Sequence, residues 1–200
     1  MASTVPAVAA SVFAGKKFVI RQKLWTLATQ KFFVEDEAGN ALGFFPRKIF
    51  KLKDDIRLYG DESMTRELLR IQARSIIDFS VAFDVVDAVN GQKAGALKRR
   101  GWKSILKDEW ILMDTMDVEI GRVKEDSALL ATLRRFVTNL IPQRYQITVD
   151  THEVGTVKQN FNIFAPKLFV DFTPDMANRL DPRLGLAAAM LLIAVEGRQR

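Results

Sequence analysis

The chain ends on its most apolar stretch, residues 180–200, which reads LDPRLGLAAAMLLIAVEGRQR. Twelve residues without a charge, Leu184–Val195, lie between Arg183 and Glu196. As an α-helix they would span ~18 Å at ~1.5 Å per residue, whereas crossing a bilayer takes ~20 apolar residues. A helix that is apolar all round must be covered on every side. The stretch is therefore predicted to be a buried helix of the fold and not a membrane anchor.

The residues at either end of this stretch carry the signals of a helix with defined termini. Asp181 is a suitable N-cap, Pro182 fits the first helical turn, and Gly197 fits the stop. The small residues Gly185 and Ala187–Ala189 would let other backbone approach one side closely. A helix threaded through a closed β-barrel meets all of these demands.

Four strand-turn-strand units precede the helix and share one pattern. In each, an apolar strand runs to an aspartate, and a glycine follows inside the next strand. The aspartates are Asp36, Asp87, Asp114 and Asp150, and the glycines are Gly43, Gly95, Gly121 and Gly155. Aspartate side chains bond turn amides, so hairpin turns account for them, and metal ligation is the alternative interpretation. The pattern indicates a meander whose unit is one hairpin.

Counting the runs between these units, the chain holds about a dozen short strands, which favours a barrel or a sandwich over an α/β fold. The exception is DSALLATLRRFVTNLIP, residues 126–142, whose apolar residues fall at helical spacing and predict one amphipathic helix packed on the barrel. We expect a single mainly β domain over residues 17–200, preceded by a flexible N-terminus over residues 1–16.

Composition narrows the classes of function. The chain has 200 residues, of which 48% are hydrophobic and 27% charged, as in ordinary globular proteins. Cysteine is absent, which excludes disulfides, thiolate metal sites and thiol nucleophiles. The opening MASTVPAVAASVFAG has no basic residue that would form the start of a secretory signal. These features predict a cytoplasmic protein. Its net charge of +6 favours an anionic partner.

No catalytic signature is present. His152 is the only histidine and lies in the turn sequence DTHEVG, without the partners that base catalysis needs. The chain has no Ser-His-Asp set, no glycine-rich phosphate loop and no metal-ligand spacing. The sequence therefore predicts a non-enzymatic protein with no catalytic residue, metal or cofactor.

Two basic segments are the candidate anion-binding sites. The first is KRRGWKS and the second is FFPRKIFKLK; their candidate residues are Lys98, Arg99, Arg100, Trp102 and Lys103 in the first, and Arg47, Lys48, Lys51 and Lys53 in the second. Clustered cations hold phosphate by charge-assisted hydrogen bonds, and tryptophan suits a membrane interface. The structural alternatives are a solvated hairpin with Trp102 folded inward and a half-exposed strand.

The order of motifs resembles the LURP-one-related proteins of the tubby-like and phospholipid-scramblase superfamily. The matching stretches are FKLKDDIRLYGDESMTRELLRIQARSIID at 50–78, FDVVDAVNGQKAGALKRRGWKSILKDEWILMD at 83–114 and LDPRLGLAAAMLLIAVEG at 180–197. The resemblance covers about residues 17–197 and implies a twelve-stranded barrel around the helix. Tubby domains are associated with phosphoinositides and scramblases with calcium and lipid movement. The spacing of Asp171, Asp175 and Asp181 does not match a calcium loop, so calcium binding is not carried over.

The charge and the resemblance together predict a module that docks reversibly on anionic phospholipid or phosphoinositide surfaces, as a cytoplasmic protein peripheral to the membrane and without a transmembrane segment. The alternative is a nucleic-acid-binding or regulatory protein that uses the same basic segments. A third possibility is a carrier with a small apolar ligand inside the barrel, but a central helix would fill that space.

Overall fold

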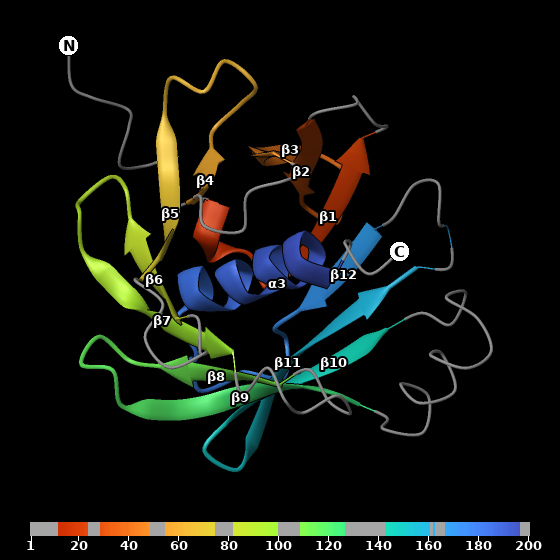
Figure 1. Cartoon of the computed structure of the whole chain (residues 1–200). Coiled ribbons are helices and arrows are strands. Elements are labelled where there is room, and N and C mark those ends of the chain that lie inside the picture. The colour runs from red at the N-terminus through yellow and green to blue at the C-terminus, as the bar shows by residue number, and fades with distance from the viewer. Residues whose placement is uncertain are drawn as a thin grey trace.

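The twelve strands form one closed antiparallel barrel. The computed structural model describes residues 12–23, 29–48, 55–74, 82–99, 109–126, 143–160, 162 and 167–196. Each strand pairs with its neighbours in sequence, and the first pairs with the twelfth to close the ring (Figure 1). The predicted fold class, a mainly β closed barrel of about twelve strands with a hydrophobic C-terminal helix, is confirmed.

The elements are short, as the sequence indicates. They are β1 (Lys17–Lys23), β2 (Thr29–Glu35), β3 (Ala41–Lys48), β4 (Ile56–Tyr59), β5 (Glu67–Ala73), β6 (Ala82–Asp87), β7 (Lys93–Arg99), β8 (Glu109–Met113), β9 (Glu119–Glu125), β10 (Arg144–Val149), β11 (His152–Gln159), β12 (Lys167–Asp171) and α3 (Pro182–Glu196). The helix expected within 126–142 lies outside the described residues.

The helix α3 lies inside the ring of strands (Figure 1). Every side chain from Leu184 to Ala194 is buried, and these side chains form one core with the inward residues of the barrel wall. The wall alternates as a half-buried strand should: in β6, Phe83 and Val85 are buried whereas Ala82 and Asp84 are only partly so. The apolar stretch that closes the chain is therefore the centre of the core.

The barrel has two different ends. Successive strands alternate in direction, so all odd-numbered strands finish at one end and all even-numbered strands at the other. The turn end consists of residues 36–40, 60–66, 88–92, 114–118, 150–151 and 172–181, the last of which leads into α3. The loop end is defined by the last residues of the odd-numbered strands, namely Lys23, Lys48, Ala73, Arg99, Glu125 and Gln159.

The aspartates predicted to shape the hairpins all lie at the turn end. Asp36 accepts a hydrogen bond from the Asn40 amide at 2.8 Å, and Asp87 accepts one from the Val89 amide at 2.9 Å. Asp114 binds two amides of its turn, and Asp150 occupies a left-handed conformation with φ of 52°. Within the described residues no three His, Asp or Glu side chains group as metal ligands. The turns account for these aspartates.

The same irregularity recurs in five hairpins. Each has a β-bulge in which one residue of the second strand has no partner opposite it. The extra residues are Leu42, Leu68, Ala94, Ile120 and Val154. The first four are spaced 26 residues apart. The repeat therefore includes the β4–β5 hairpin, which the four-unit pattern missed because Leu69 stands there in place of the glycine.

The repeated glycines lie where one hairpin meets the next. A Cβ atom on Gly121 would lie 2.1 Å from the carbonyl oxygen of Thr148, and one on Gly95 would lie 2.5 Å from that of Met113. On Gly43 the nearest backbone atom, the Tyr59 oxygen, would be 3.0 Å away. Glycine is needed here because the neighbouring strand comes too close for a side chain.

The glycine contacts predict a ranking of stability. Gly121→Ala should lower the free energy of unfolding by about 3 kcal/mol, since the added methyl group meets rigid backbone. Gly43→Ala should cost less, because its closest contact is the movable Leu58 side chain. Urea denaturation of both variants measures the difference, and an equal cost for the two would contradict this role of the glycines.

The position of α3 predicts that a charge within it prevents folding. Ala188 and Leu191 are only 4% and 1% exposed, so Ala188→Asp or Leu191→Asp buries an unpaired carboxylate, which costs about 3–5 kcal/mol or more. That is comparable with the whole stability of a typical domain. Expression and circular dichroism should show no soluble folded protein, whereas Met176→Asp, at a fully accessible position, should fold. A soluble, folded Leu191→Asp variant that had lost only membrane attachment would restore the anchor interpretation.

Candidate functional site

The two predicted basic segments approach the same end of the barrel. Arg47 and Lys48 close β3, and Lys98 and Arg99 close β7. Both strands run toward the loop end, separated by β4, β5 and β6. The side chains of Lys98 and Arg99 are half-buried. Lys51, Lys53, Arg100, Trp102 and Lys103, together with the side chains of Arg47 and Lys48, lie outside what the structure describes.

The outer wall of β1–β3 carries cations over aromatic rings. The Arg21 guanidinium lies 5.4 Å from the centre of the Phe33 ring, and the Lys23 ammonium lies 5.5 Å from it. Lys31 lies 5.9 Å from the ring of Phe44. These distances fall within the ~6 Å range of cation–π attraction. Sequence analysis missed this face, although the basic residues of β1 recur at even spacings, as outward residues of a strand do.

The turns of the turn end are mainly acidic, in contrast to the basic outer wall of β1–β3. Its turns carry the acidic residues Asp36, Glu37, Asp61, Glu62, Asp114, Asp117, Asp150, Asp175 and Asp181, against the basic residues Arg66 and Arg179. Some of these acids bind cations on nearby strands; Glu62, for example, pairs with Lys31 at 2.8 Å. The alternation of strand direction thus sorts charge along the barrel axis.

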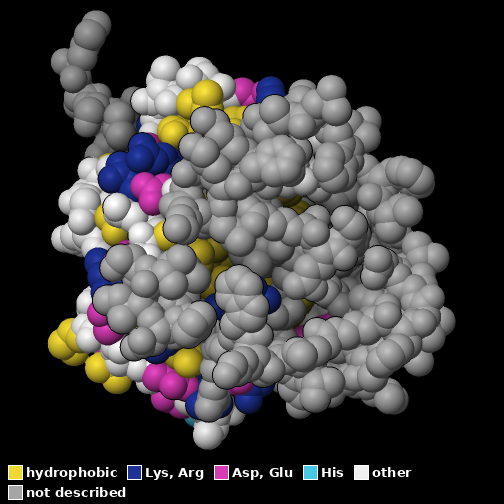
Figure 2. All heavy atoms as spheres, viewed as in Figure 1, with side chains coloured by type: hydrophobic (Ala, Val, Ile, Leu, Met, Phe, Trp, Pro, Cys, Tyr) yellow, Lys and Arg dark blue, Asp and Glu magenta, His cyan; other side chains and the backbone are white. Residues whose placement is uncertain are grey.

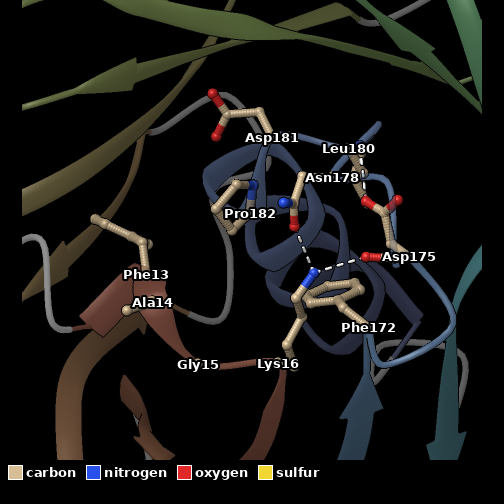
Figure 3. Close-up of a pocket in the computed structure, with 10 residues that line it drawn as sticks. All are labelled: Phe13, Ala14, Gly15, Lys16, Phe172, Asp175, Asn178, Leu180, Asp181 and Pro182. Atoms are coloured by element: carbon tan, nitrogen blue, oxygen red, sulfur yellow. Dashed lines mark hydrogen bonds between the residues drawn. The ribbon is translucent and has the colours of Figure 1, made fainter.

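A cavity of about 310 Å³ opens at the turn end, beside the start of α3 (Figure 3). Its walls include the apolar side chains of Phe13, Phe172 and Leu180. Lys16 Nζ points across it and donates to the carbonyl oxygen of Asp175 and to Asn178 Oδ1, both at 2.7 Å. Nothing in the sequence signals this contact, because 159 residues separate Lys16 from Asp175.

The contacts of the cavity fasten the N-terminal segment to the turn before α3. Val12 is buried in the core, and residues 12–14 form one helical turn ahead of β1. Asp175 is itself buried and accepts hydrogen bonds from the amides of Arg179 and Leu180. Lys16 therefore binds groups that the fold already holds in place, which is a structural role for the lysine.

An ion pair anchors the first turn of α3 to the wall. Arg183 Nη1 lies 2.9 Å from Asp87 Oδ2, and Nη2 lies 2.6 Å from Asp181 Oδ2. The hydrogen bonds that Arg183 donates to Asp181 and to Asp87 raise the pKa of Arg183 above its ordinary value. Asp181 also caps the helix through the Arg183 amide at 2.9 Å, as predicted.

A four-residue charge network on the outer wall links the residue after β5 to strands β6 and β7 and to the β8–β9 turn. Asp117 Oδ1 lies 2.6 Å from both Arg74 Nη2 and Lys93 Nζ, and the same two cations bind Asp84. Hydrogen bonds from Arg74 and then Lys93 lower the pKa of Asp117 to about 2. The network holds the β8–β9 turn against its neighbours.

His152, the predicted inert histidine, is exposed at the start of β11.

Within the described part of the chain, no helix combines the length and the apolarity that crossing a bilayer requires. Comparison with protein-family models, curated proteins and solved structures finds no match for this chain. The resemblance to the LURP-one-related proteins stays a prediction.

The charge network predicts a pH dependence of stability. Because the folded state lowers the pKa of Asp117, its contribution is present above pH 4 and is lost as the pH falls toward 2. Asp117→Asn should destabilise the protein at pH 7 by only about 0.5 kcal/mol, since the carboxylate is 44% exposed and screened by water. Denaturation curves at pH 7 and pH 2 should show this difference at the first and a smaller one at the second, where the carboxylate is partly protonated.

Proposed function

We propose that this protein is a binding module, not an enzyme, that docks its loop end reversibly on anionic phospholipid surfaces. The observation that carries the proposal is that β3 and β7 run in the same direction. Both strands therefore end at the loop end, and the candidate residues of the two predicted basic segments begin there. Such an arrangement lets separate segments contact a single flat surface. The cytoplasmic leaflet, with its anionic lipids, is the surface that this charge fits.

The composition of the segments between the strands also supports docking through the loop end. The segments that join the strand ends of the loop end contain eight basic residues against five acids; the basic residues are Lys51, Lys53, Arg74, Arg100, Lys103, Lys107, Arg134 and Arg135, and the acids are Asp54, Asp55, Asp78, Asp108 and Asp126. They also contain Trp25 and Trp102. Basic residues near an anionic membrane contribute about 1 kcal/mol each, and tryptophan favours the interface.

The acidic turns support one orientation of the barrel. Anionic lipid repels the turn end and attracts the loop end, so the field of the whole protein turns the axis toward the membrane normal during approach. This orientation needs no membrane-spanning helix, and it leaves α3 in the core. The association is electrostatic and therefore weakens as salt is added.

Vesicle binding tests the proposal. The protein should sediment with phosphatidylcholine vesicles that contain phosphatidylserine and not with pure phosphatidylcholine vesicles. Lys51→Glu with Lys98→Glu changes one cation in each basic segment and should weaken binding by about 30-fold, which corresponds to ~2 kcal/mol.

The matched control is Lys17→Glu, the same charge reversal at the turn end, which should leave vesicle binding unchanged. Circular dichroism checks that each variant folds. Equal, negligible binding to both kinds of vesicle would refute lipid docking. Affinity for duplex DNA that falls steeply with salt, without vesicle binding, would instead favour the nucleic-acid alternative.

A further inference from the structure

We propose that the turn end is a second docking surface, which takes a cationic amphipathic segment of a partner protein. The observation is the location of exposed apolar side chains. Within the described residues, six large apolar side chains are exposed, and five lie in the turns of this end: Met64, Val89, Met116, Val118 and Met176. The sixth, Phe169, lies on the wall in β12.

The exposure is large where turns are normally polar. Met176 is 92% exposed and Met116 is 78% exposed. Apolar side chains protrude at the edge of the molecule beside the β8–β9 turn (Figure 2). Apolar side chains gathered at one end of a molecule mark interaction sites, and methionine adapts its shape to varied partners.

Met64 adds a conformational observation. It has a positive φ of 56°, a left-handed conformation that favours glycine or asparagine and is rare for a bulky apolar residue. The β4–β5 turn would therefore be better served by asparagine, which also prefers water. The fold gives no reason for an exposed methionine at this position, whereas a binding surface does.

Three of the turns are neighbours in the ring of strands. The β4–β5, β6–β7 and β8–β9 hairpins are consecutive around the barrel, and they carry Met64, Val89, and Met116 with Val118. Lys93, next to the second turn, binds Asp117 of the third at 2.6 Å, which holds these two tips together. These consecutive hairpins thus carry exposed apolar side chains on one side of the turn end.

The charges around the exposed apolar side chains indicate which kind of partner the turn end binds. Asp61 and Glu62 precede Met64, and Asp114 and Glu119 flank the β8–β9 tip. Glu62 pairs with Lys31 and Glu119 with Arg122, whereas the carboxylates of Asp61 and Asp114 accept hydrogen bonds from amides of their own turns. Acidic groups around apolar tips complement a segment with lysines or arginines on one face and apolar residues on the other. They repel anionic lipid, and they also oppose the pairing of two copies turn end to turn end. The site is separate from the loop end and does not depend on the lipid proposal.

Fluorescence anisotropy with a labelled leucine–lysine amphipathic peptide tests this surface in the absence of lipid. The triple variant Met64→Asn, Met116→Ser, Val118→Ser should weaken peptide binding about tenfold or more, because it removes the central apolar contacts. Its melting temperature should be unchanged or higher, since asparagine relieves the left-handed position. Phe169→Ser changes an apolar residue on the wall that is about as exposed as Met64, at 46% against 48%; it is the control and should bind as the unaltered chain does.

Equal affinity of the triple variant and the unaltered chain would overturn the proposal, as would equal binding of a scrambled, non-amphipathic peptide of the same composition. Sedimentation velocity that shows self-association of the unaltered chain, lost in the triple variant, would make a second copy the occupant and also overturn it. Retained binding of the triple variant to phosphatidylserine vesicles supports the separation of the two ends. Loss of that binding would place the tips in the lipid site and contradict the proposal.

Discussion

The burial of α3 is the constraint on which the rest of the structure depends. The helix has no polar face, and each described side chain from Leu184 to Ala194 is shielded from water. An open sheet would cover only one side of such a helix, so the sheet must close around it. A helix with its side chains is ~10–12 Å across, and eight strands leave room only for the side chains of the wall. A barrel of twelve strands supplies the wider interior that the helix occupies.

Closing the sheet also decides where binding can take place. The described strands form a ring without an edge strand that another chain could extend, and the helix fills the interior that other barrels use for ligands. Binding partners therefore have the outer wall and the two ends of the barrel as contact surfaces. The meander makes those ends unequal, because every connection at one of them is a short hairpin or the turn that leads into α3.

Local patterns in the sequence predict most of this fold, and distant contacts do not. The apolar run, its caps and the Asp–Gly pattern each act within about a dozen residues, and they sufficed to predict the helix and four of the hairpins. The fifth hairpin was missed because Leu69 replaces the glycine, although its bulge and its place in the 26-residue spacing match the others.

The candidate sites show the same division between local and distant information. The basic segments were identifiable from composition, but their arrival at a common end follows from strand direction around the ring. The hydrogen bond from Lys16 to the carbonyl oxygen of Asp175 joins residues that are 159 apart in the sequence. The packing of Arg21 over Phe33 depends on strand register. No pattern within a short window contains either contact. The exposed methionines are likewise of an apolar type that is usually buried. Only their location in turns of the structure shows that they face water.

The two ends are far apart along most of the barrel. A strand of seven residues is ~23 Å long at ~3.3 Å per residue, and the Debye length at physiological salt is ~8 Å. Most charges at one end are therefore screened from those at the other. The exception is the network of Arg74, Asp84, Lys93 and Asp117, which runs along the wall from the end of β5 to the β8–β9 turn. The rigid connection between them is the packed core, where α3 begins at the turn end and is fixed there by Arg183, Asp181 and Asp87. Two connections join the ends: the charge network on the wall and the core helix, whose close packing opposes a shift within the barrel.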